Sequence, residues 1–429
     1  MNKKQRKTGG ILISLVLGVS MTGCGGGLAE PSDGSVSASS SASLSSSETP
    51  AAIQTELDGS FESFDMERFT RKLWEGKTVY FETLCFMERE DGSIASGSLL
   101  YTPDKILSVR SYNLRTVYEE GRDYAVSGSR LIRTDDSRIP AFPLSEYREP
   151  TNNVNAWLKI TGTDQSLRIN AAGRLVYQVA VCYTHSDGWQ GLEPESQMEF
   201  LPKTAARLAG KEKLKLVFYG DSITAGWDAS GQNEATLDPD TFKEVKMVSG
   251  RPPYTPAWAE IVTKKLQSVY GYTNITRANR AVSGTTSTWG KQKVSALVNP
   301  EKPDLAVIAF GMNEATAPGD GFRANIEEIM DTIHAQNPDT EFLLVSCMIP
   351  NCDAETFAQN RLEEQEEALY AIQSERTDLA VGVVPVHSMF LSMQELGKLH
   401  TDYSGNNVNH PNDFAVCVYA QMILNALGC

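Results

Sequence analysis

Continuous apolar runs alternate with helical segments through the second half of the chain, and this alternation constrains the possible folds most. The runs are "LKLVFYGDS", "DLAVIAFG", "EFLLVSC" and "LAVGVVPV", with a weaker one at "NITRANRAV". A strand that is apolar along its whole length is buried on both faces, as in a parallel sheet. Helical segments such as "PAWAEIVTKKLQSVYG" and "FRANIEEIMDTIHAQ" separate the runs. We therefore predict a doubly wound parallel α/β sheet over residues 209–429.

A different pattern occupies residues 55–208. Short runs rich in β-branched and aromatic residues, such as "TVYFETLCF", "KILSVRSYN" and "RLVYQVAVCYT", are separated by Gly, Asp, Asn and Pro. Short strands at regular spacing are typical of two packed antiparallel sheets. These residues are predicted to form a smaller β-sandwich domain, jelly-roll-like, in front of the α/β domain.

The first residues carry the pattern of an export signal. Basic residues precede the apolar stretch "ILISLVLGVSM", which is too short for a permanent membrane span. The following "MTGC" resembles the lipobox of bacterial lipoproteins, which implies removal of residues 1–23 and lipidation of Cys24. An ordinary secretory signal with an incidental cysteine is the alternative. Residues 24–54 are rich in serine, as flexible linkers are, so we expect a protein tethered to the outer face of the bacterial membrane.

The net charge excludes one class of partner. Without residues 1–23 the chain keeps 35 basic and 54 acidic residues, a net charge of −19. An acidic surface of this kind disfavours nucleic acid and anionic membrane faces. The acyl chains on Cys24 would then hold the protein at the membrane.

The cysteines show no pattern of a metal site. Apart from Cys24 there are six, without a CxxC pair and without metal-ligand spacing to histidine. We predict no zinc site. Whether the cysteines form disulfides is left open, since an exported protein can form them. Cys85 and Cys182, however, lie in strand-like runs and resemble small core residues.

Polar residues follow three of the predicted strands of the α/β sheet, at the edge where such sheets bind ligands. In "FYGDSITAG", Ser222 could cap the next helix or serve as an exposed nucleophile. In "NRAVSGTTS", Gly284 could be a turn residue or offer its N–H to a developing oxyanion. In "AFGMNEAT", Asn313 could form a local turn or donate its amide to the same oxyanion.

One histidine lies in a setting unsuited to a core residue. His410 is in the polar stretch "NNVNHPNDF" near the C-terminus. An imidazole has an ordinary pKa of about 6.5, which suits proton transfer near neutral pH. His185 belongs to the β-rich part, and His334 and His387 belong to helical segments. His400, on the same C-terminal segment, is the rival candidate for a general base.

The four motifs together resemble the SGNH or GDSL-type hydrolases, which are named for Ser, Gly, Asn and His in that order. Here they are "GDSI", "AVSGTTS", "GMNE" and "NVNHP". The resemblance covers roughly residues 214–427 and implies a flavodoxin-like sheet with no metal or organic cofactor. It makes Ser222 the nucleophile and His410 the general base. The oxyanion hole would be formed by the backbone amides of Ser222 and Gly284 and by the side chain of Asn313.

The chain departs from the family pattern beside His410. Many members carry Asp three residues before the histidine, but this position is Asn407 here. Asp402 and Asp413 are near in sequence without the usual spacing. An amide accepts a hydrogen bond from an imidazole N–H, yet it stabilises imidazolium less than a carboxylate does. We therefore expect a Ser–His dyad in which a backbone carbonyl orients the base, with Asn407, Asp402 and Asp413 as candidate side-chain partners.

The expected activity follows from the resemblance. A β-rich domain ahead of the hydrolase looks like the layout of some carbohydrate esterases, including carbohydrate esterase family two. This layout implies a serine esterase that removes short acyl groups, above all acetyl, from carbohydrate. One alternative is a lipase or lysophospholipase on the same scaffold, which the lack of a long apolar lid sequence disfavours. The other is a non-catalytic carbohydrate-binding surface lipoprotein, which the complete set of motif residues argues against.

Overall fold

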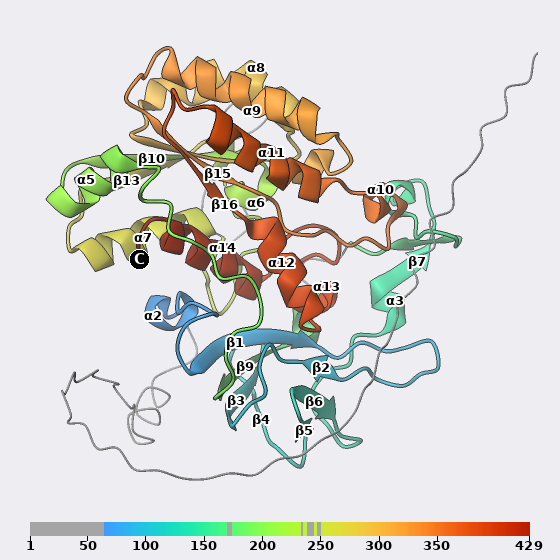
Figure 1. The fold of residues 1–429 in the computed structure, drawn as a ribbon. Helices are drawn as coiled ribbons and strands as arrows, with labels where there is room; N and C mark the ends of the chain where they lie inside the picture. Colours follow the sequence, from blue (N-terminus) through green and yellow to red (C-terminus); the bar gives the residue numbers. More distant parts are fainter. Residues whose placement is uncertain (1–63, 170–173, 233–234, 238–243, 247–249) are drawn as a thin grey trace, which may run out of the picture. The chain divides into compact units, whose positions relative to one another are not determined.

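Five parallel strands form the central sheet of the second half of the chain (Figure 1). The computed structural model describes residues 64–169, 174–232, 235–237, 244–246 and 250–429. Every neighbouring pair in the sheet is parallel, and in chain order the strands lie 2-1-3-4-5, the flavodoxin-like arrangement. The predicted doubly wound α/β fold is confirmed. The strand order is β13 (Ile275–Asn279), β10 (Leu214–Gly220), β14 (Leu305–Ala309), β15 (Glu341–Val345) and β16 (Val381–Val384).

The continuous apolar runs of the sequence reflect a sheet that is covered on both faces. In β10, Leu214, Leu216 and Phe218 belong to one hydrophobic cluster, whereas Val217 and Tyr219 belong to a second. Because both faces exclude water, the strand shows no alternation of polar and apolar residues. The first face is covered by α7 (Trp258–Tyr270) and α14 (Asp413–Ala426), and the second by α8 (Ser287–Leu297), α9 (Gly319–His334) and α11 (Leu362–Glu375) (Figure 1).

Helix α14 is covered on all sides. Every residue from Phe414 to Ala426 is buried, as expected of a helix that is apolar all round. Gln421 connects this helix to the beginning of the chain, because it accepts a hydrogen bond from the Leu73 amide at 3.1 Å and donates one to the Phe69 carbonyl at 3.0 Å. Since α14 begins three residues after His410, its burial fixes one end of the loop that carries this histidine.

Antiparallel strands form the first half of the chain, which we call the β-rich half; the part from α5 (Pro202–Gly210) onward is the α/β half. All of the strand pairs of the three sheets named below are antiparallel. The prediction of a β-rich part in front of the α/β sheet is confirmed. One sheet has the order β1 (Thr78–Cys85), β9 (Gln178–Thr184), β3 (Lys105–Ser111), β4 (Val117–Tyr118); a second has β2 (Gly97–Ser98), β6 (Arg130–Arg133), β5 (Tyr124–Ser127); and β7 (Arg148–Pro150) pairs with β8 (Gln165–Leu167).

The two halves share one hydrophobic core. All eight residues of β1 are buried, so this strand has no solvent-facing side. Phe81 and Leu84 of β1 belong to the same cluster as Trp258 of α7 and Tyr419 of α14. All of the described residues accordingly belong to one compact unit. The β-rich half is therefore packed into the α/β half through apolar side chains.

The connection between the halves is helical. Helix α5 spans the predicted boundary between residues 208 and 209. Glu341, at the start of β15, accepts hydrogen bonds from the Lys203 amide at 2.8 Å and the Thr204 amide at 2.7 Å. A carboxylate at the N-terminus of a helix is also favoured by the helix dipole. These contacts join the first turn of α5 to the α/β half.

The predicted signal segment, the linker and Cys24 lie outside the described residues. Within the part of the chain that the structure describes, no helix combines the length and apolar character needed to cross a membrane. The elements not yet named are α2 (Met66–Phe69), α3 (Leu144–Tyr147), η1 (Ala156–Leu158), η2 (Leu175–Tyr177), α6 (Ser222–Ala225), β11 (Ala235–Leu237), β12 (Glu244–Lys246), η3 (Asn299–Glu301), η4 (Met312–Glu314), α10 (Glu355–Ala358), α12 (Val386–Glu395) and α13 (His400–Tyr403).

Candidate active site

Three of the predicted site residues follow the carboxyl ends of three neighbouring strands. Ser222 follows β10, Gly284 follows β13, and Asn313 follows β14. In the sheet, β10 lies between β13 and β14. The loop of the serine is therefore flanked by the loops of the other two residues. This is the edge at which open α/β sheets bind their ligands.

In the turn after β10, the hydroxyl of Ser222 is not used to cap the following helix. Helix α6 begins at Ser222, and its N-cap is Asp221, whose side chain accepts a hydrogen bond from the Ile223 amide at 3.0 Å. The capping role that the sequence left open for Ser222 thus belongs to Asp221. The first amides of a helix have no partner within the helix, so the Ser222 N–H lies in a position suited to an oxyanion.

His410 joins Ser222 to a carboxylate. Its Nε2 lies 2.9 Å from the Ser222 Oγ, and its Nδ1 lies 2.8 Å from the Asp228 Oδ2. The His410 and Asp228 side chains are only 16% and 8% exposed, so water competes little for the bond between them. The three side chains form a serine–histidine–aspartate triad by geometry and by the role that each atom can take.

The two other oxyanion candidates lie on the exposed side of the site. Gly284 has a φ of 74°, which favours glycine, and a Cβ at this position would meet no atom within 4 Å. The Asn313 Nδ2 donates to the Thr285 carbonyl at 3.0 Å. Because Nδ2 carries two hydrogens, this bond orients the amide and leaves one N–H for a ligand. It also connects the loop of Asn313 to the loop of Gly284.

A family model matches most of the α/β half. Residues 218–414, which include all four motifs, match the GDSL-like Lipase/Acylhydrolase family. The chain contains a GDSL-like acylhydrolase domain. A search of curated proteins finds no match to the chain.

Solved structures similar to the chain cover about half of it. One is a two-domain esterase (CEX) active on acetylated mannans, at 18% identity and a TM-score of 0.39, covering 54% of this chain and 53% of that chain. Another is a catalytic mutant of Axe2, an acetylxylan esterase from Geobacillus stearothermophilus, at 19% identity and a TM-score of 0.38, covering 50% and 94%. A third is a putative GDSL-like lipase from Parabacteroides merdae, at 16% identity and a TM-score of 0.36, covering 50% and 96%. The match thus spans about half the length of the two-domain esterase.

Asp228 is the site residue that the sequence prediction missed. The expectation of a Ser–His dyad is wrong for this structure, because the Asp228 carboxylate occupies the position beside Nδ1. Gly226 ends α6 with a φ of 93°, and Asp228 follows with a φ of 68°. The left-handed region is tolerated by Asp better than by most residues. The available signal was "SITAGWDAS", in which Asp228 is the sole acid and follows a helix-ending glycine.

The hydrogen bonds of the Asn407 side chain go to the β-rich half and not to His410. Its Nδ2 donates to the Tyr147 carbonyl at 2.9 Å and to the Arg168 carbonyl at 3.2 Å, and its Oδ1 accepts from Arg174 at 3.2 Å. All of these partners belong to the β-rich half. The candidate role of Asn407 as the side chain that orients His410 is therefore wrong, because its amide is fully engaged elsewhere.

The two aspartates near His410 in sequence are likewise engaged away from the imidazole. Asp402 accepts from the Cys85 amide and from the Leu399 amide, both at 2.8 Å. Asp413 accepts from the Ser230 amide at 2.8 Å. Neither orients His410 directly, so both candidate roles are wrong. Asp413 nevertheless holds the segment that follows Asp228, and burial raises the pKa of both carboxyl groups.

The polar stretch around His410 folds into a closed loop. The Asn406 Oδ1 accepts hydrogen bonds from three successive amides, those of Val408 and Asn409 at 2.9 Å and that of His410 at 3.1 Å. The Gly405 amide donates to the His410 carbonyl at 2.8 Å. An Asn side chain that binds amides further along the chain makes a turn of this kind. Asn406 thus holds the backbone of the base.

The rival histidine does not belong to the site. His400 begins α13, and neither of its ring nitrogens has a hydrogen-bond partner in the described part of the chain. Burial holds the pKa of His400 well below its ordinary value, so its ring stays neutral. It packs edge-on against Tyr403, with ring centroids 5.1 Å apart. His400 is a partly buried side chain outside the Ser222–His410–Asp228 chain of contacts.

The carboxyl group of Asp221 has unusual electrostatics. Burial raises the pKa of Asp221 from 3.8 to about 7, while its bond to the Ile223 amide and the nearby charge of His410 act in the opposite direction. Burial likewise raises the pKa of Glu314, whose carboxylate binds the amide and hydroxyl of Ser287. The carboxyl groups of Asp221 and Glu314 thus favour their protonated forms more than exposed carboxyl groups would.

The described residues contain no cluster of three or more His, Cys, Asp or Glu side chains that could hold a metal ion.

The six cysteines that the structure describes are all free, and five of them are partly or fully buried. Burial raises the pKa of Cys85 and of Cys182 to about 12. These two thiols stay protonated and serve as small core side chains.

Proposed function

We propose that this protein is a serine esterase that removes short acyl groups, above all acetyl, from carbohydrate. The observation that carries the proposal is the chain of contacts from the Ser222 Oγ through His410 to Asp228, at 2.9 and 2.8 Å. A nucleophile within hydrogen-bond reach of a base, which is itself oriented by a third group, is the signature of covalent acyl transfer.

The geometry supports a two-step reaction. The Ser222 Oγ attacks the ester carbonyl carbon while His410 Nε2 accepts the hydroxyl proton. Asp228 holds Nδ1–H and stabilises the imidazolium that forms. His410 then gives the proton to the departing alcohol oxygen, which leaves an acyl-enzyme. Water attacks this ester by the same route, and the carboxylic acid is released as Ser222 regains its proton.

Three donors are available for the oxyanion in each step. We assign them to the Ser222 amide, the Gly284 amide and the Asn313 Nδ2. The bond from Asn313 to the Thr285 carbonyl holds this donor before the substrate arrives, so little reorganisation is needed. Removing one such donor typically costs about 3–4 kcal/mol of transition-state stabilisation.

The choice of carbohydrate ester has two supports. The first is the layout of a β-rich half before the hydrolase, which resembles that of carbohydrate esterases. The second is Trp227, which is 36% exposed and has its ring centroid 6.3 Å from that of His410. A partly exposed aromatic ring beside the base offers an apolar surface to a sugar ring while leaving the sugar hydroxyl groups in water.

We also propose that the protein acts outside the cytoplasm, held to the bacterial membrane through lipid on Cys24. The support is the "MTGC" ending of the apolar signal and the serine-rich stretch that follows it. The composition of residues 24–54 predicts a linker, and a flexible linker of about 30 residues has an r.m.s. reach of roughly 30 Å. A tether of that length would let the catalytic half meet polymeric substrates above the lipid surface.

Acetate release from a panel of acetylated glycans tests the activity. We expect acetate from at least one glycan with the wild type and none with Ser222→Ala, whose fold is checked by circular dichroism. Acetate release by Ser222→Ala equal to that of the wild type would refute the nucleophile.

The alternatives predict other results. A lipase would favour aryl esters of long acyl chains and phospholipids over aryl acetate, and would leave the acetylated glycans intact. A binding protein without activity would bind the glycans but would not react with a phosphonate that labels active serines.

A further inference from the structure

A buried arginine of the β-rich half binds the loop that leads to His410. The Arg174 Nη2 donates to the Thr401 carbonyl at 2.7 Å, Nε to the Ser404 carbonyl at 3.2 Å, and Nη1 to the Asn407 Oδ1 at 3.2 Å. The Arg174 residue is 1% exposed. Its guanidinium lies over the Phe142 ring, 4.7 Å from the centroid. One side chain thus binds three points of the segment 401–407.

Burying the Arg174 guanidinium in this way costs free energy. All three hydrogen bonds of Arg174 go to neutral oxygens. Moving a guanidinium out of water without a bound carboxylate costs several kcal/mol, and burial lowers the pKa of Arg174 accordingly. An apolar side chain of similar volume would be cheaper in a core. The planar fork of arginine, however, can hold several carbonyl groups in one fixed geometry.

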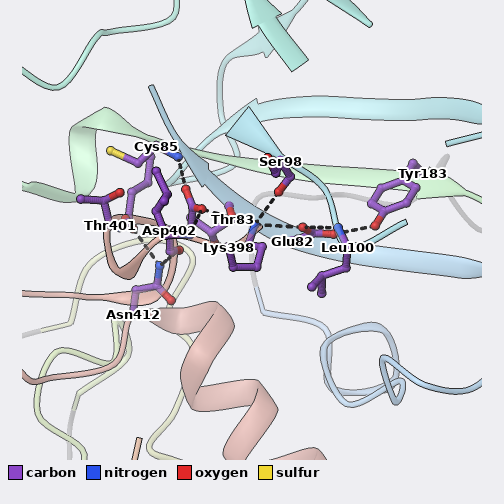
Figure 2. A network of polar contacts seen from close by, with 12 residues as sticks. Glu82, Thr83, Cys85, Ser98, Leu100, Tyr183, Lys398, Thr401, Asp402 and Asn412 are labelled. Carbon is purple, nitrogen blue, oxygen red and sulfur yellow. Dashed lines mark hydrogen bonds and ion pairs between the residues drawn. The ribbon is translucent and has the colours of Figure 1, made fainter. Parts of the chain in front are cut away.

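A second group of contacts holds the start of this segment and Lys398, which lies three residues before it. Figure 2 shows Lys398 and Asp402 beside β1. The Lys398 Nζ binds Glu82 at 2.9 Å and the Thr83 carbonyl at 2.7 Å, and Asp402 accepts from the Cys85 amide at 2.8 Å. The Lys398 and Glu82 side chains are both completely buried. The segment before His410 is therefore bound to the β-rich half by charged groups at both ends.

Movement at Arg174 would be transmitted directly to the base. Ser404, whose carbonyl Arg174 binds, pairs with Pro411 in an antiparallel bridge. The neighbouring Gly405 amide donates to the His410 carbonyl at 2.8 Å. Asn407, the third contact of Arg174, lies three residues before His410. No flexible spacer lies between the arginine contacts and the backbone of the histidine.

We propose that Arg174 is a positioning residue: from the β-rich half it holds segment 401–407 so that His410 stays aligned between Ser222 and Asp228. This inference rests on the proposed function. It makes the β-rich half a part of the catalytic apparatus in addition to any role in binding carbohydrate.

The test compares Arg174→Met with Gln421→Leu in the full chain. Gln421 also joins the two halves through buried hydrogen bonds, but to Phe69 and Leu73 instead of the His410 loop. We expect both variants to lower the melting temperature. Only Arg174→Met should lower kcat on an aryl acetate, on the order of 100-fold for a displaced base, with KM within about twofold of the wild type. Arg174→Lys, which keeps the charge and a donor, should recover part of kcat.

A second readout does not depend on turnover. The downfield proton NMR signal of His410 Nδ1–H bound to Asp228, assigned by its absence in Asp228→Asn, should be lost in Arg174→Met and kept in Gln421→Leu. Arg174→Met with wild-type kcat and an intact signal would overturn the proposal. If the wild type hydrolysed no ester, the proposed function would fail, and the NMR signal alone would decide the role of Arg174. If Arg174→Met did not fold, Arg174→Lys carries the same comparison, and wild-type kcat with an intact signal in that variant would overturn the proposal.

Discussion

At the scale of single residues, the site depends on an aspartate that follows the serine by six positions. Asp228 reaches His410 because Gly226 ends α6 after one turn and reverses the chain. Asp413, the N-terminal residue of α14, binds the Ser230 amide and so holds the same segment. The carboxylate beside the base thus comes from a segment 182 positions earlier in the chain.

Replacing the carboxylate of Asp228 should impair catalysis without removing the base. We expect Asp228→Asn to lower kcat by on the order of 10³–10⁴-fold, because an amide can favour the wrong imidazole tautomer and does not stabilise imidazolium. The matched control is Asp413→Asn, which keeps a carbonyl oxygen for the Ser230 amide and should stay within about tenfold of the wild type. Rates on an aryl acetate measure both. Near-wild-type activity of Asp228→Asn would show that catalysis does not need this carboxylate and would support a Ser–His dyad.

Asp221 should make stability depend on pH. The pKa of Asp221 is raised from 3.8 to about 7, so the folded protein binds this proton more tightly than the unfolded chain does. Its contribution to the free energy of unfolding is fully present below pH 3.8 and is lost as the pH rises to about 7. Asp221→Asn keeps an acceptor for the helix cap and removes the titration.

Urea unfolding of the wild type and Asp221→Asn at several pH values measures this effect. The difference in free energy of unfolding between the two proteins should change in the asparagine's favour between pH 4 and 7. Other groups also titrate in this range, but they are common to both proteins and cancel in the difference. Parallel pH curves for the two proteins would contradict the raised pKa.

At the scale of elements, the loop between α13 and α14 places the base. Hydrogen bonds within the loop fix its shape, the buried α14 fixes its end, and the β-rich half binds its beginning. Gly405 lies where this loop meets the Asp228 segment: a Cβ there would be 2.8 Å from the Asp228 Cβ and 2.7 Å from the Pro411 carbonyl oxygen. The two catalytic segments are therefore packed directly against each other.

A methyl group at Gly405 should separate these segments. We expect Gly405→Ala to cost about 1–3 kcal/mol of stability through overpacking and to lower kcat at least about tenfold by displacing Asp228 or His410. Gly321→Ala in α9, where a Cβ would meet no atom within 4 Å, is the control and should not lower activity. Thermal unfolding and aryl acetate kinetics measure the two effects. Equal kinetics for the two variants would show that the close packing does not position the triad.

At the scale of the whole molecule, the β-rich and α/β halves share a core. Phe81 and Leu84 of β1 lie in one cluster with Trp258 and Tyr419 of the α/β half, and charged groups such as Lys398 are buried between the halves. A boundary of this kind differs from the polar, loosely packed interfaces usual between independent domains. Removing either half would expose apolar surface and unpaired charge.

The two halves should therefore unfold together. Calorimetry of a protein that begins after the linker should show a single heat-absorption peak, with a calorimetric enthalpy equal to the van't Hoff enthalpy. The control is the circular dichroism melt at far- and near-ultraviolet wavelengths, which should give the same midpoint. Two separate peaks would mean that the shared core does not couple the halves.

The anchor is tested at the same scale. In a bacterial host, the wild-type protein should partition with membranes, and Cys24→Ala should be released from them or fail to mature. Cys352→Ala, a change at another cysteine that is exposed, serves as the control and should stay with the membranes. A soluble wild-type protein cleaved at a site other than Cys24 would refute the proposal.

The sequence alone determined the parallel sheet and the positions of the chemical groups at its edge. Ser222 and Asn313 could be found because they follow continuous apolar strands at short range, and burial on both faces of a sheet leaves a clear pattern. Gly284 follows the weaker run of β13, in which only Ile275 is buried, and was found through its motif. His410 could be found because it lies in a polar stretch of sequence, although the structure buries most of that stretch, with Asn406 and Asn407 only 5% and 1% exposed. Each of these inferences depends on local sequence.

Only the tertiary structure decided what orients the base. Asp228 and His410 are separated by 182 positions, and no local pattern reports which carboxylate a distant loop will meet. Asp402 and Asp413 are nearer in sequence, yet packing directs them to the Cys85 and Ser230 amides. The contact of Arg174 with the His410 loop was hidden for the same reason: long-range contacts are set by how the two halves pack, and the sequence around each residue does not record them.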